Sequence, residues 1–271
     1  MIDAHFHIWR PARGDYGWLT PALGAIHRDV AIADWRRQAE PCGVTGGILV
    51  QAAASEAETR FLLDAGAAEP GSPGLGVVGW VDLAAADAPA RVARMAAEPL
   101  VKGLRPMLQD IADPDWILDP SVAPGLAAMA AHGLAFDALV RPIHLPRIRA
   151  LADRLPNLTI IIDHGAKPDI AGDGFAPWAA EIERIARDTR AFCKLSGLLT
   201  EAGAAPERVP RYIAHLIACF GPDRLIWGSD WPVLELAGSY QAWHALAQAA
   251  VPPADRAAIF GLNARRAYRL A

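Results

Sequence analysis

The sequence predicts an α/β protein folded as a single (β/α)8 barrel domain over residues 1–271. Two observations predict this fold. Strand-length apolar runs alternate with amphipathic helical stretches along the whole chain, and ionisable residues directly follow several of the runs. A doubly wound open sheet is the competing fold. It usually has fewer strands and a glycine-rich phosphate turn after the first strand, where this chain has His-Phe-His-Ile-Trp.

The predicted strands are short and nearly continuous in apolar residues, as expected for parallel strands covered on both faces. Two longer insertions, 10–29 and 107–119, follow the first and fourth strands, so we expect them at the catalytic mouth as lids or substrate walls. The strands are predicted at 2–7, 46–51, 76–82, 101–106, 135–140, 159–164, 192–196 and 225–230. The helices between them are predicted at 32–42, 55–68, 88–98, 120–132, 145–155, 178–187, 206–220 and 239–249.

The composition argues against several classes of function. Hydrophobic residues make up 53% of the chain, which is enough for a large core, and the net charge is −4 with the charged residues scattered. This pattern disfavours binding to nucleic acids or to a membrane surface. Neither a secretory leader nor an apolar run of membrane-spanning length is visible, and the three cysteines lack C-x-x-C spacing. We therefore expect a cytoplasmic protein with reduced thiols.

The first predicted strand carries two histidines near its carboxyl end. His5 and His7 stand two residues apart, so both side chains point to the same face of the strand. At the mouth of a barrel, two adjacent imidazoles can bind a metal or hydrogen-bond a polar substrate. The alternative is a pair of structurally hydrogen-bonded histidines, because H-x-H alone is a weak motif.

The sixth and eighth predicted strands also end in ionisable residues. The sixth breaks into Asp163 and His164, and the eighth ends in Gly-Ser followed by Asp230. Polar residues at the carboxyl ends of barrel strands are typical of catalytic sites, and a desolvated carboxylate beside imidazoles is suited to be a general base. We expect His164 and Asp230 to be catalytic and Asp163 to support them. Alternatively, Asp230 caps the turn before Pro232.

Five stretches of the chain are more specific together than any one motif. They are 3–9, 102–106, 163–168, 194–197 and 228–232. In this order they resemble the amidohydrolase superfamily, and within it the amidohydrolase-2 branch of sugar lactonases, which includes L-fuconolactonases and L-rhamnonolactonases. The resemblance implies an amidohydrolase-like TIM barrel and a lactonase whose catalytic residues are Asp230, His164, His5 and His7.

The resemblance also bears on cofactors. Metal-dependent members of the superfamily commonly add a Lys or His ligand from the fifth strand, but residues 135–140 contain neither. A tetrahedral Zn2+ site could still be formed by His5, His7, His164 and Asp230. The lactonases of this branch work without a tightly bound metal. The resemblance therefore implies no obligatory cofactor, and at most a weakly bound divalent metal such as zinc.

Other polar and aromatic residues near the predicted strand ends are candidate substrate contacts. Cationic and hydroxyl groups could bind substrate oxygens, and aromatic rings could cover the C–H face of a sugar. For each of them, ion pairing or packing is the alternative. The candidates are Arg105, Lys167, Lys194, Ser196, Trp9, Trp18 and Trp231.

The predicted reaction is hydrolysis of an L-fucono-, L-rhamnono- or similar aldonolactone to its aldonic acid, by water activated at Asp230. A neutral lactone of a six-carbon or 6-deoxy sugar is favoured over pyrone or muconolactone acids, which need more cations. The alternatives are a metal-dependent decarboxylase or a dicarboxylate lactonase of the same superfamily, and a non-catalytic sugar-acid binding protein. The expected partner is a small-molecule lactone, and the oligomeric state stays open.

Overall fold

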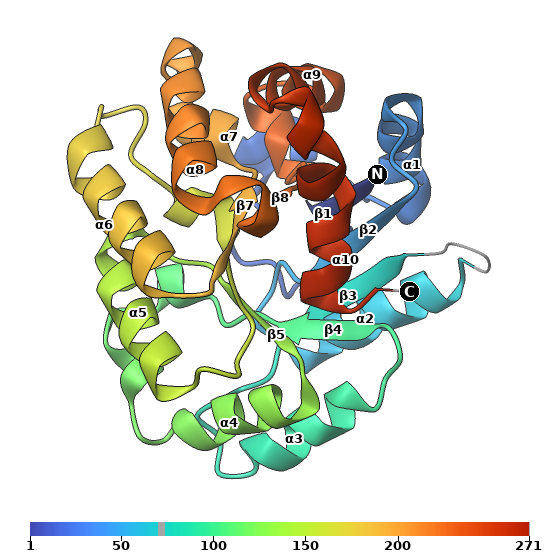
Figure 1. Ribbon diagram of the computed structural model, residues 1–271. Coiled ribbons are helices and arrows are strands. Elements are labelled where there is room, and N and C mark those ends of the chain that lie inside the picture. Colours follow the sequence, from blue (N-terminus) through green and yellow to red (C-terminus); the bar gives the residue numbers. More distant parts are fainter. Residues whose placement is uncertain (70–73, 271) are drawn as a thin grey trace.

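The computed structural model describes residues 1–69 and 74–270, and it confirms the predicted barrel (Figure 1). Eight parallel strands pair in sequence order. The first and last strands also meet, because the His7 amide donates to Trp231 O and the Asp230 amide donates to His5 O, each at 2.8 Å. The strands are β1 (Ile2–Phe6), β2 (Gly46–Val50), β3 (Leu75–Gly79), β4 (Val101–Leu104), β5 (Ala135–Ala138), β6 (Ile160–Ile162), β7 (Phe192–Leu195) and β8 (Leu225–Trp227).

Helices follow the strands and surround them on the outside (Figure 1). Their bounds differ from the prediction mainly at the ends, and two short helices, α7 and α10, were not predicted. The helix predicted over 206–220 is a 3-10 turn followed by α8, which extends to Arg224. The helices are α1 (Ile32–Ala39), α2 (Glu56–Ala67), α3 (Ala88–Ala96), α4 (Ala123–His132), α5 (Leu145–Arg154), α6 (Phe175–Asp188), α7 (Leu198–Ala202), α8 (Val209–Arg224), α9 (Tyr240–Ala250) and α10 (Asn263–Tyr268).

The strands end earlier at their carboxyl ends than the sequence predicts. The strand predicted to reach residue 164 ends at Ile162, and the one predicted to reach residue 230 ends at Trp227. The reason is backbone geometry: His164 has φ 53° and Asp230 has φ 60°, in the left-handed region that a strand cannot use. The chain therefore leaves the sheet where the predicted catalytic residues begin.

The barrel interior is apolar at its amino-terminal end. Small and branched side chains from the strands meet there, and α10 packs against them and covers this end. Layers of this kind fill the inside of such barrels and leave no pore. The strand residues are Ile2, Ala4, Ile48, Val50, Val78, Ala135, Ile161 and Ile226, and the α10 residues are Ala264, Ala267 and Tyr268. Among the described helices, none combines the length and apolar character needed to cross a bilayer.

Candidate active site

The four residues predicted to be catalytic come together at the carboxyl-terminal mouth of the barrel. Asp230 Oδ1 lies 3.3 Å from His7 Nε2, and 3.6 Å and 3.8 Å from the Nε2 atoms of His5 and His164. The Nε2 atoms of His5 and His7 are 3.2 Å apart. All four residues are buried. Thus β1 and the loops after β6 and β8 build one cluster from distant parts of the sequence.

A cavity of ≈210 Å³, here named the reaction cavity, opens onto this cluster. Both long insertions contribute to its walls, Trp18 from 10–29 and Met107 from 107–119, in agreement with their predicted place at the mouth. The wall residues are His7, Trp18, Ala52, Arg105, Met107, Gln109, Asp110, Leu139, His164, Lys167, Asp230 and Val233.

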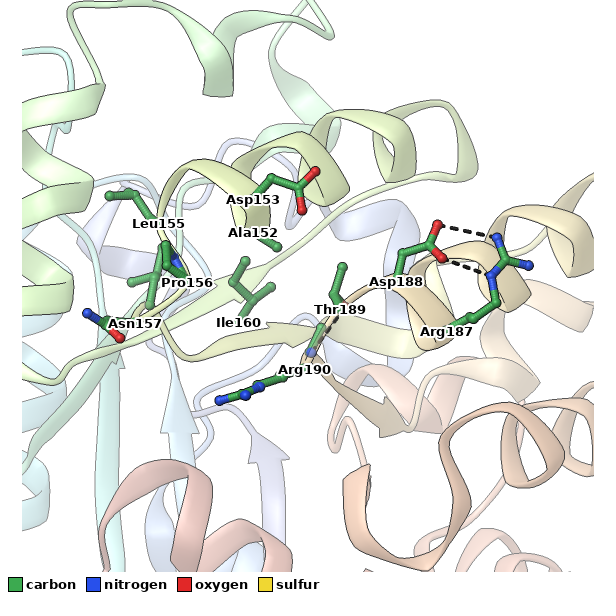
Figure 2. A pocket seen from close by; sticks show the side chains of 12 residues that line it. Ala152, Asp153, Leu155, Pro156, Asn157, Ile160, Arg187, Asp188, Thr189 and Arg190 are labelled. Atoms are coloured by element: carbon green, nitrogen blue, oxygen red, sulfur yellow. Dashed lines mark hydrogen bonds and ion pairs between the residues drawn. The ribbon is translucent and has the colours of Figure 1, made fainter.

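A different hollow lies at the opposite rim, between the turns that precede β6 and β7 (Figure 2). Its volume is ≈480 Å³, and Figure 2 shows an Arg187–Asp188 ion pair at one side of it. The side chains drawn there include no histidine. Barrels of this type carry out chemistry at the carboxyl-terminal face, so the reaction cavity is the candidate site.

The backbone around the cluster is strained, and glycines make room for the rings. His164, Lys167 and Asp230 all have positive φ, which costs free energy in residues with a Cβ and is often found at functional sites. A Cβ at Gly197 would lie 2.7 Å from His164 Cγ, and one at Gly228 would lie 2.9 Å from His5 Cβ. Gly197 therefore lets the His164 imidazole pack directly against backbone, and Gly228 lets the chain after β8 approach the backbone of His5.

Hydrogen-bond partners assign the tautomers of His5 and His7. His7 Nδ1 lies 2.7 Å from Val50 O, which can only accept, so His7 carries its proton on Nδ1 and presents a lone pair at Nε2. Lys194 Nζ lies 3.1 Å from His5 Nδ1 and donates to it, so neutral His5 is protonated at Nε2. His5 Nε2 then donates to His7 Nε2, and the two rings form one ordered chain.

Lys194 is completely buried beneath His5. Its ammonium lies 2.6 Å from Asp137 Oδ2 and 2.9 Å from Asp163 Oδ1. The ammonium donates hydrogen bonds to Asp137 Oδ2 and His5 Nδ1, and its contact with Asp163 is an ion pair. Since Ser196 Oγ is likewise buried, at 2.8 Å from His164 Nδ1, neither residue is among the walls of the reaction cavity. Both residues were predicted to contact the substrate; in the structure they lie behind the imidazoles and hydrogen-bond to them.

Arg105 and Lys167 do reach the reaction cavity, as predicted for substrate contacts. Each is also paired: Arg105 Nη1 lies 3.1 Å from Asp163 Oδ2, and Lys167 Nζ lies 2.5 Å from Glu201 Oε1. The cations of the cavity wall are therefore largely neutralised by carboxylates behind them.

Of the three tryptophans predicted to contact substrate, the reaction cavity is lined by Trp18, which is 38% exposed. Its Nε1 donates to Ala52 O at 2.7 Å. Trp9 is buried and lies behind the wall, with its ring centroid 6.0 Å from that of His7. Trp231 is also buried, and its Nε1 donates to Glu235 Oε1 at 2.7 Å. Packing therefore explains Trp9 and Trp231 better than a sugar contact does.

Burial controls the ionisation of the cluster. Burial and the adjacent Lys194 ammonium hold the pKa of His5 well below its usual value, and burial lowers the pKa of His164 to about 4. Burial opposes ionisation of Asp230, but the surrounding His164, His7 and His5 outweigh it and keep the pKa of this carboxyl below its ordinary value. At neutral pH the site therefore has an ionised Asp230 beside neutral His5 and His164.

Asp3 is a structural residue of the site to which sequence reasoning gave no role. Its carboxylate accepts hydrogen bonds from Ser229 Oγ at 2.6 Å, from Trp35 Nε1 at 2.9 Å and from Tyr240 Oη at 3.0 Å. It thereby fastens β1 to the turn that carries Asp230. The signal in the sequence was a carboxylate inside an apolar strand, which is stable there only when fully hydrogen-bonded.

Glu58 and the segment after β2 were also missed. Three consecutive carbonyls, from Val50 to Ala52, accept hydrogen bonds from different residues of the site, namely His7, Arg105 and Trp18. Glu58 of α2 fixes this segment, since its buried carboxylate accepts the amide hydrogens of Ala52 and Ala53 at 2.9 and 2.6 Å. Burial raises the pKa of Glu58 to about 7, although these amides oppose the shift. Its signal, a carboxylate on the apolar face of a helix, is weak.

The cluster has the spacing of a metal site. One atom each from His5, His7 and Asp230 lies within 4.8 Å of the others, and all three residues are buried. The separations of 3.2 to 3.6 Å are close to the roughly 3.4 Å between ligands of a tetrahedral zinc ion. His5, Asp163 and His164 form a second such group.

Comparison with known proteins is in accord with this architecture. The sequence model of the amidohydrolase family matches residues 2–270. The chain belongs to the amidohydrolase family. The family membership expected from the five sequence stretches is thereby confirmed.

Two relatives of this chain are L-fucono-1,5-lactonases. The one from Burkholderia ambifaria is 46% identical over 278 residues, which cover 99% of this chain and 95% of the relative. The one from Burkholderia multivorans is 34% identical over 286 residues, with coverage of 99% and 96%. A crystal structure of an amidohydrolase from Burkholderia multivorans with bound zinc has a TM-score of 0.92 and 33% identity, covering 100% of this chain and 99% of that one.

Proposed function

We propose that the protein hydrolyses a sugar-derived lactone to its aldonic acid, with L-fuconolactone as the first candidate substrate. The observation that carries this proposal is an ionised carboxylate, Asp230, placed beside neutral imidazoles and Arg105 on one small cavity. Similarity to two L-fucono-1,5-lactonases over nearly the full chain supports the choice of substrate.

The attacking water is held and activated by Asp230. Its Oδ1 lies on the cavity wall and can accept a hydrogen bond from the water, while His7 Nε2 already accepts the hydrogen of His5 Nε2. Asp230 takes a proton as the water oxygen bonds to the lactone carbonyl carbon. Polarisation of the carbonyl supplies the rest of the rate, because it stabilises the negative charge that develops on the carbonyl oxygen.

Arg105 and His164 supply that polarisation. Both line the reaction cavity. The Arg105 guanidinium, whose Nη atoms are bonded to Asp163 and Gln51, brings positive charge to the wall, and the Nε2 hydrogen of His164 can point at the carbonyl oxygen as it gains negative charge. Ser196 behind His164 and Asp163 behind Arg105 hold the two groups in place. Loss of one preorganised donor of this type typically costs roughly 100- to 1000-fold in rate.

Ring opening follows from collapse of the tetrahedral intermediate. The bond between the carbonyl carbon and the ring oxygen breaks, and protonated Asp230 returns its proton to the departing alkoxide. No serine nucleophile takes part, because the buried Ser229 Oγ donates to Asp3 Oδ2 at 2.6 Å instead. The site thus uses water directly, without a covalent intermediate.

The charge balance of the reaction cavity favours a neutral lactone. Among the described wall residues, the two cations are Arg105 and Lys167, and both are already paired with carboxylates. Asp110 and Asp230 add negative charge to the same walls. A dicarboxylate would have to compete with these carboxylates for its counter-charges, whereas hydroxyl groups need only hydrogen bonds.

A divalent metal could be held by His5, His7 and Asp230, where it would supply Lewis-acid polarisation of the carbonyl. Two features weaken such a site. His5 would first have to lose the Nε2 proton that Lys194 fixes, and the Lys194 and Arg105 cations lie 3.1 and 3.4 Å from the His5 ring nitrogens. We therefore propose that any metal is weakly bound and not obligatory.

The direct test is a pH-indicator assay of purified protein against L-fucono-, L-rhamnono-, L-galactono- and D-arabinono-lactones, with and without chelator. The expected result is turnover of at least one lactone, with L-fuconolactone among the best. Absence of turnover across the whole panel, in both conditions, would contradict the proposal and would favour a different reaction or simple binding.

A further inference from the structure

A second hollow of ≈490 Å³ adjoins the reaction cavity at the mouth of the barrel. We name it the side hollow. The two spaces share Met107 and Asp110 as wall residues, so they lie next to each other. The side hollow is built by the loops after β2, β3 and β4. Its principal wall residues are Ala54, Trp80, Asp82, Met107, Asp110 and Trp116.

The two spaces differ in size, which indicates that they bind different parts of a substrate. The reaction cavity, at ≈210 Å³, is below the roughly 300–1,000 Å³ of ordinary small-molecule sites and suits a single lactone ring. A substituent on that ring must leave this cavity. Where it leaves past Met107 and Asp110, it enters the side hollow, whose volume lies within the ordinary range.

The walls of the side hollow have the chemistry of a sugar-binding surface. Trp80 and Trp116 are half-buried and offer two large aromatic side chains, which can stack on the C–H face of a pyranose. Asp82 and Asp110 are exposed carboxylates that can accept hydrogen bonds from ring hydroxyls. An anionic substituent would be repelled by these carboxylates, and a purely apolar one would leave them unused.

The walls are held in place before any ligand binds. The Trp80 amide donates to Thr59 Oγ1 at 2.9 Å, which ties the segment after β3 to α2. The loop of Trp116 is fastened to α5 by the 2.6 Å Asp115–Arg147 ion pair. Because these contacts already exist, a ligand need not order the loops, and its binding loses less free energy to that process.

We propose that the side hollow binds a second sugar ring, so that the substrates include glycosyl-substituted aldonolactones as well as simple ones. This inference rests on the proposed lactonase function and extends it to a substrate class. The lactone ring occupies the reaction cavity, and the glycosyl ring lies between Trp80 and Trp116 with its hydroxyls on Asp82 and Asp110.

The test uses L-fuconolactone and three derivatives that carry one neutral hexose on O2, O3 or O4, so that every ring hydroxyl of the 1,5-lactone is covered. We expect kcat/KM for at least one derivative to equal or exceed that of L-fuconolactone. In Trp116→Ala the value for that derivative should fall roughly 5- to 10-fold, as expected for loss of one aromatic contact. The value for L-fuconolactone should stay within about twofold of wild type.

Leu262→Ala, which shortens an exposed apolar side chain outside both hollows, is the control and should change neither value. The inference is overturned if all three derivatives are poorer substrates than L-fuconolactone, or if Trp116→Ala lowers both values equally. If wild-type protein hydrolyses none of the simple lactones of the panel, the proposed function fails and this inference fails with it.

Discussion

The two ends of the barrel interior use opposite physical chemistry. At the amino-terminal end, aliphatic side chains and α10 form a dry, apolar layer. At the carboxyl-terminal end, the interior holds Lys194, Asp137, Asp163 and Arg105, all buried and paired with one another. Tyr268 of α10 joins the layers, since its hydroxyl donates to Asp137 Oδ2 at 2.6 Å.

The two layers contribute different things: the apolar layer stabilises the fold, and the charged layer positions the groups of the site. The apolar layer stabilises the fold in proportion to the area that it removes from water. Buried charges often contribute little net stability, because their desolvation offsets their attraction, but they become costly when one partner is removed. In this barrel the charged layer fixes the tautomer of His5 and the place of Arg105, so its value lies in the geometry of the site.

The largest effect is expected at the mouth itself. Asp230→Asn should lower kcat for L-fuconolactone by roughly 100- to 10,000-fold, because an amide cannot take the proton of the attacking water. The fold should persist, since asparagine tolerates the positive φ of 60° at this position. Steady-state kinetics and thermal unfolding measure both effects. Asp153→Asn, in the hollow at the opposite rim, is the matched control, and a variant that keeps more than about a tenth of kcat would exclude Asp230 as the base.

The comparison of the two layers is tested by one substitution in each. Lys194→Met leaves Asp137 and Asp163 buried without their ammonium partner, and should lower the free energy of unfolding by about 3–5 kcal/mol. Ile161→Val in the apolar layer should cost only about 0.5–1.5 kcal/mol. Urea unfolding measures both values. A smaller loss for Lys194→Met than for Ile161→Val would show that the buried Asp137 and Asp163 do not depend on the Lys194 ammonium for stability.

The same contrast explains how far the sequence could predict the structure. The apolar layer comes from strand-length hydrophobic runs, so periodicity alone located all eight strands. The sequence also singled out His5, His7, His164 and Asp230, because ionisable residues interrupt those runs, and the structure brings the four together; their catalytic role stays a prediction. Periodicity cannot say which polar side chain faces another. Lys194 was therefore taken for a substrate contact, although it lies beneath His5.

Glu58 gives a pH-dependent prediction. Its pKa is about 7 in the folded protein against 4.5 unfolded, so the folded state binds more protons between these values. Its contribution to stability is thus complete below about pH 4.5 and is lost as the pH rises through about 7. Glu58→Gln should remove this loss. The histidines and the other carboxyls titrate in both proteins, so the difference between variant and wild type isolates Glu58.

Urea unfolding of both proteins at pH 5 and pH 8 measures the effect. Relative to wild type, Glu58→Gln should be more stable at pH 8 than at pH 5. An equal difference at both values would show that Glu58 is ionised throughout, held so by the amides of Ala52 and Ala53.

The smallest effect is expected from removal of metal. After exhaustive dialysis against a chelator, most lactonase activity should remain, because Lys194 keeps a proton on His5 Nε2, where a metal would have to bind. Activity is measured before dialysis, after it, and after addition of zinc. Loss of activity that zinc restores would show that the metal is obligatory.

The cations at and beneath the mouth, Arg105, Lys167 and Lys194, are paired with carboxylates of the protein, so the mouth suits a neutral ring. The measurement that tests it most directly is kcat/KM for L-fuconolactone against kcat/KM for a pyrone dicarboxylate, with the same enzyme and buffer. We expect the higher value for L-fuconolactone. A higher value for the dicarboxylate would contradict it, because Arg105 and Lys167 would then have to leave their partners to bind the substrate.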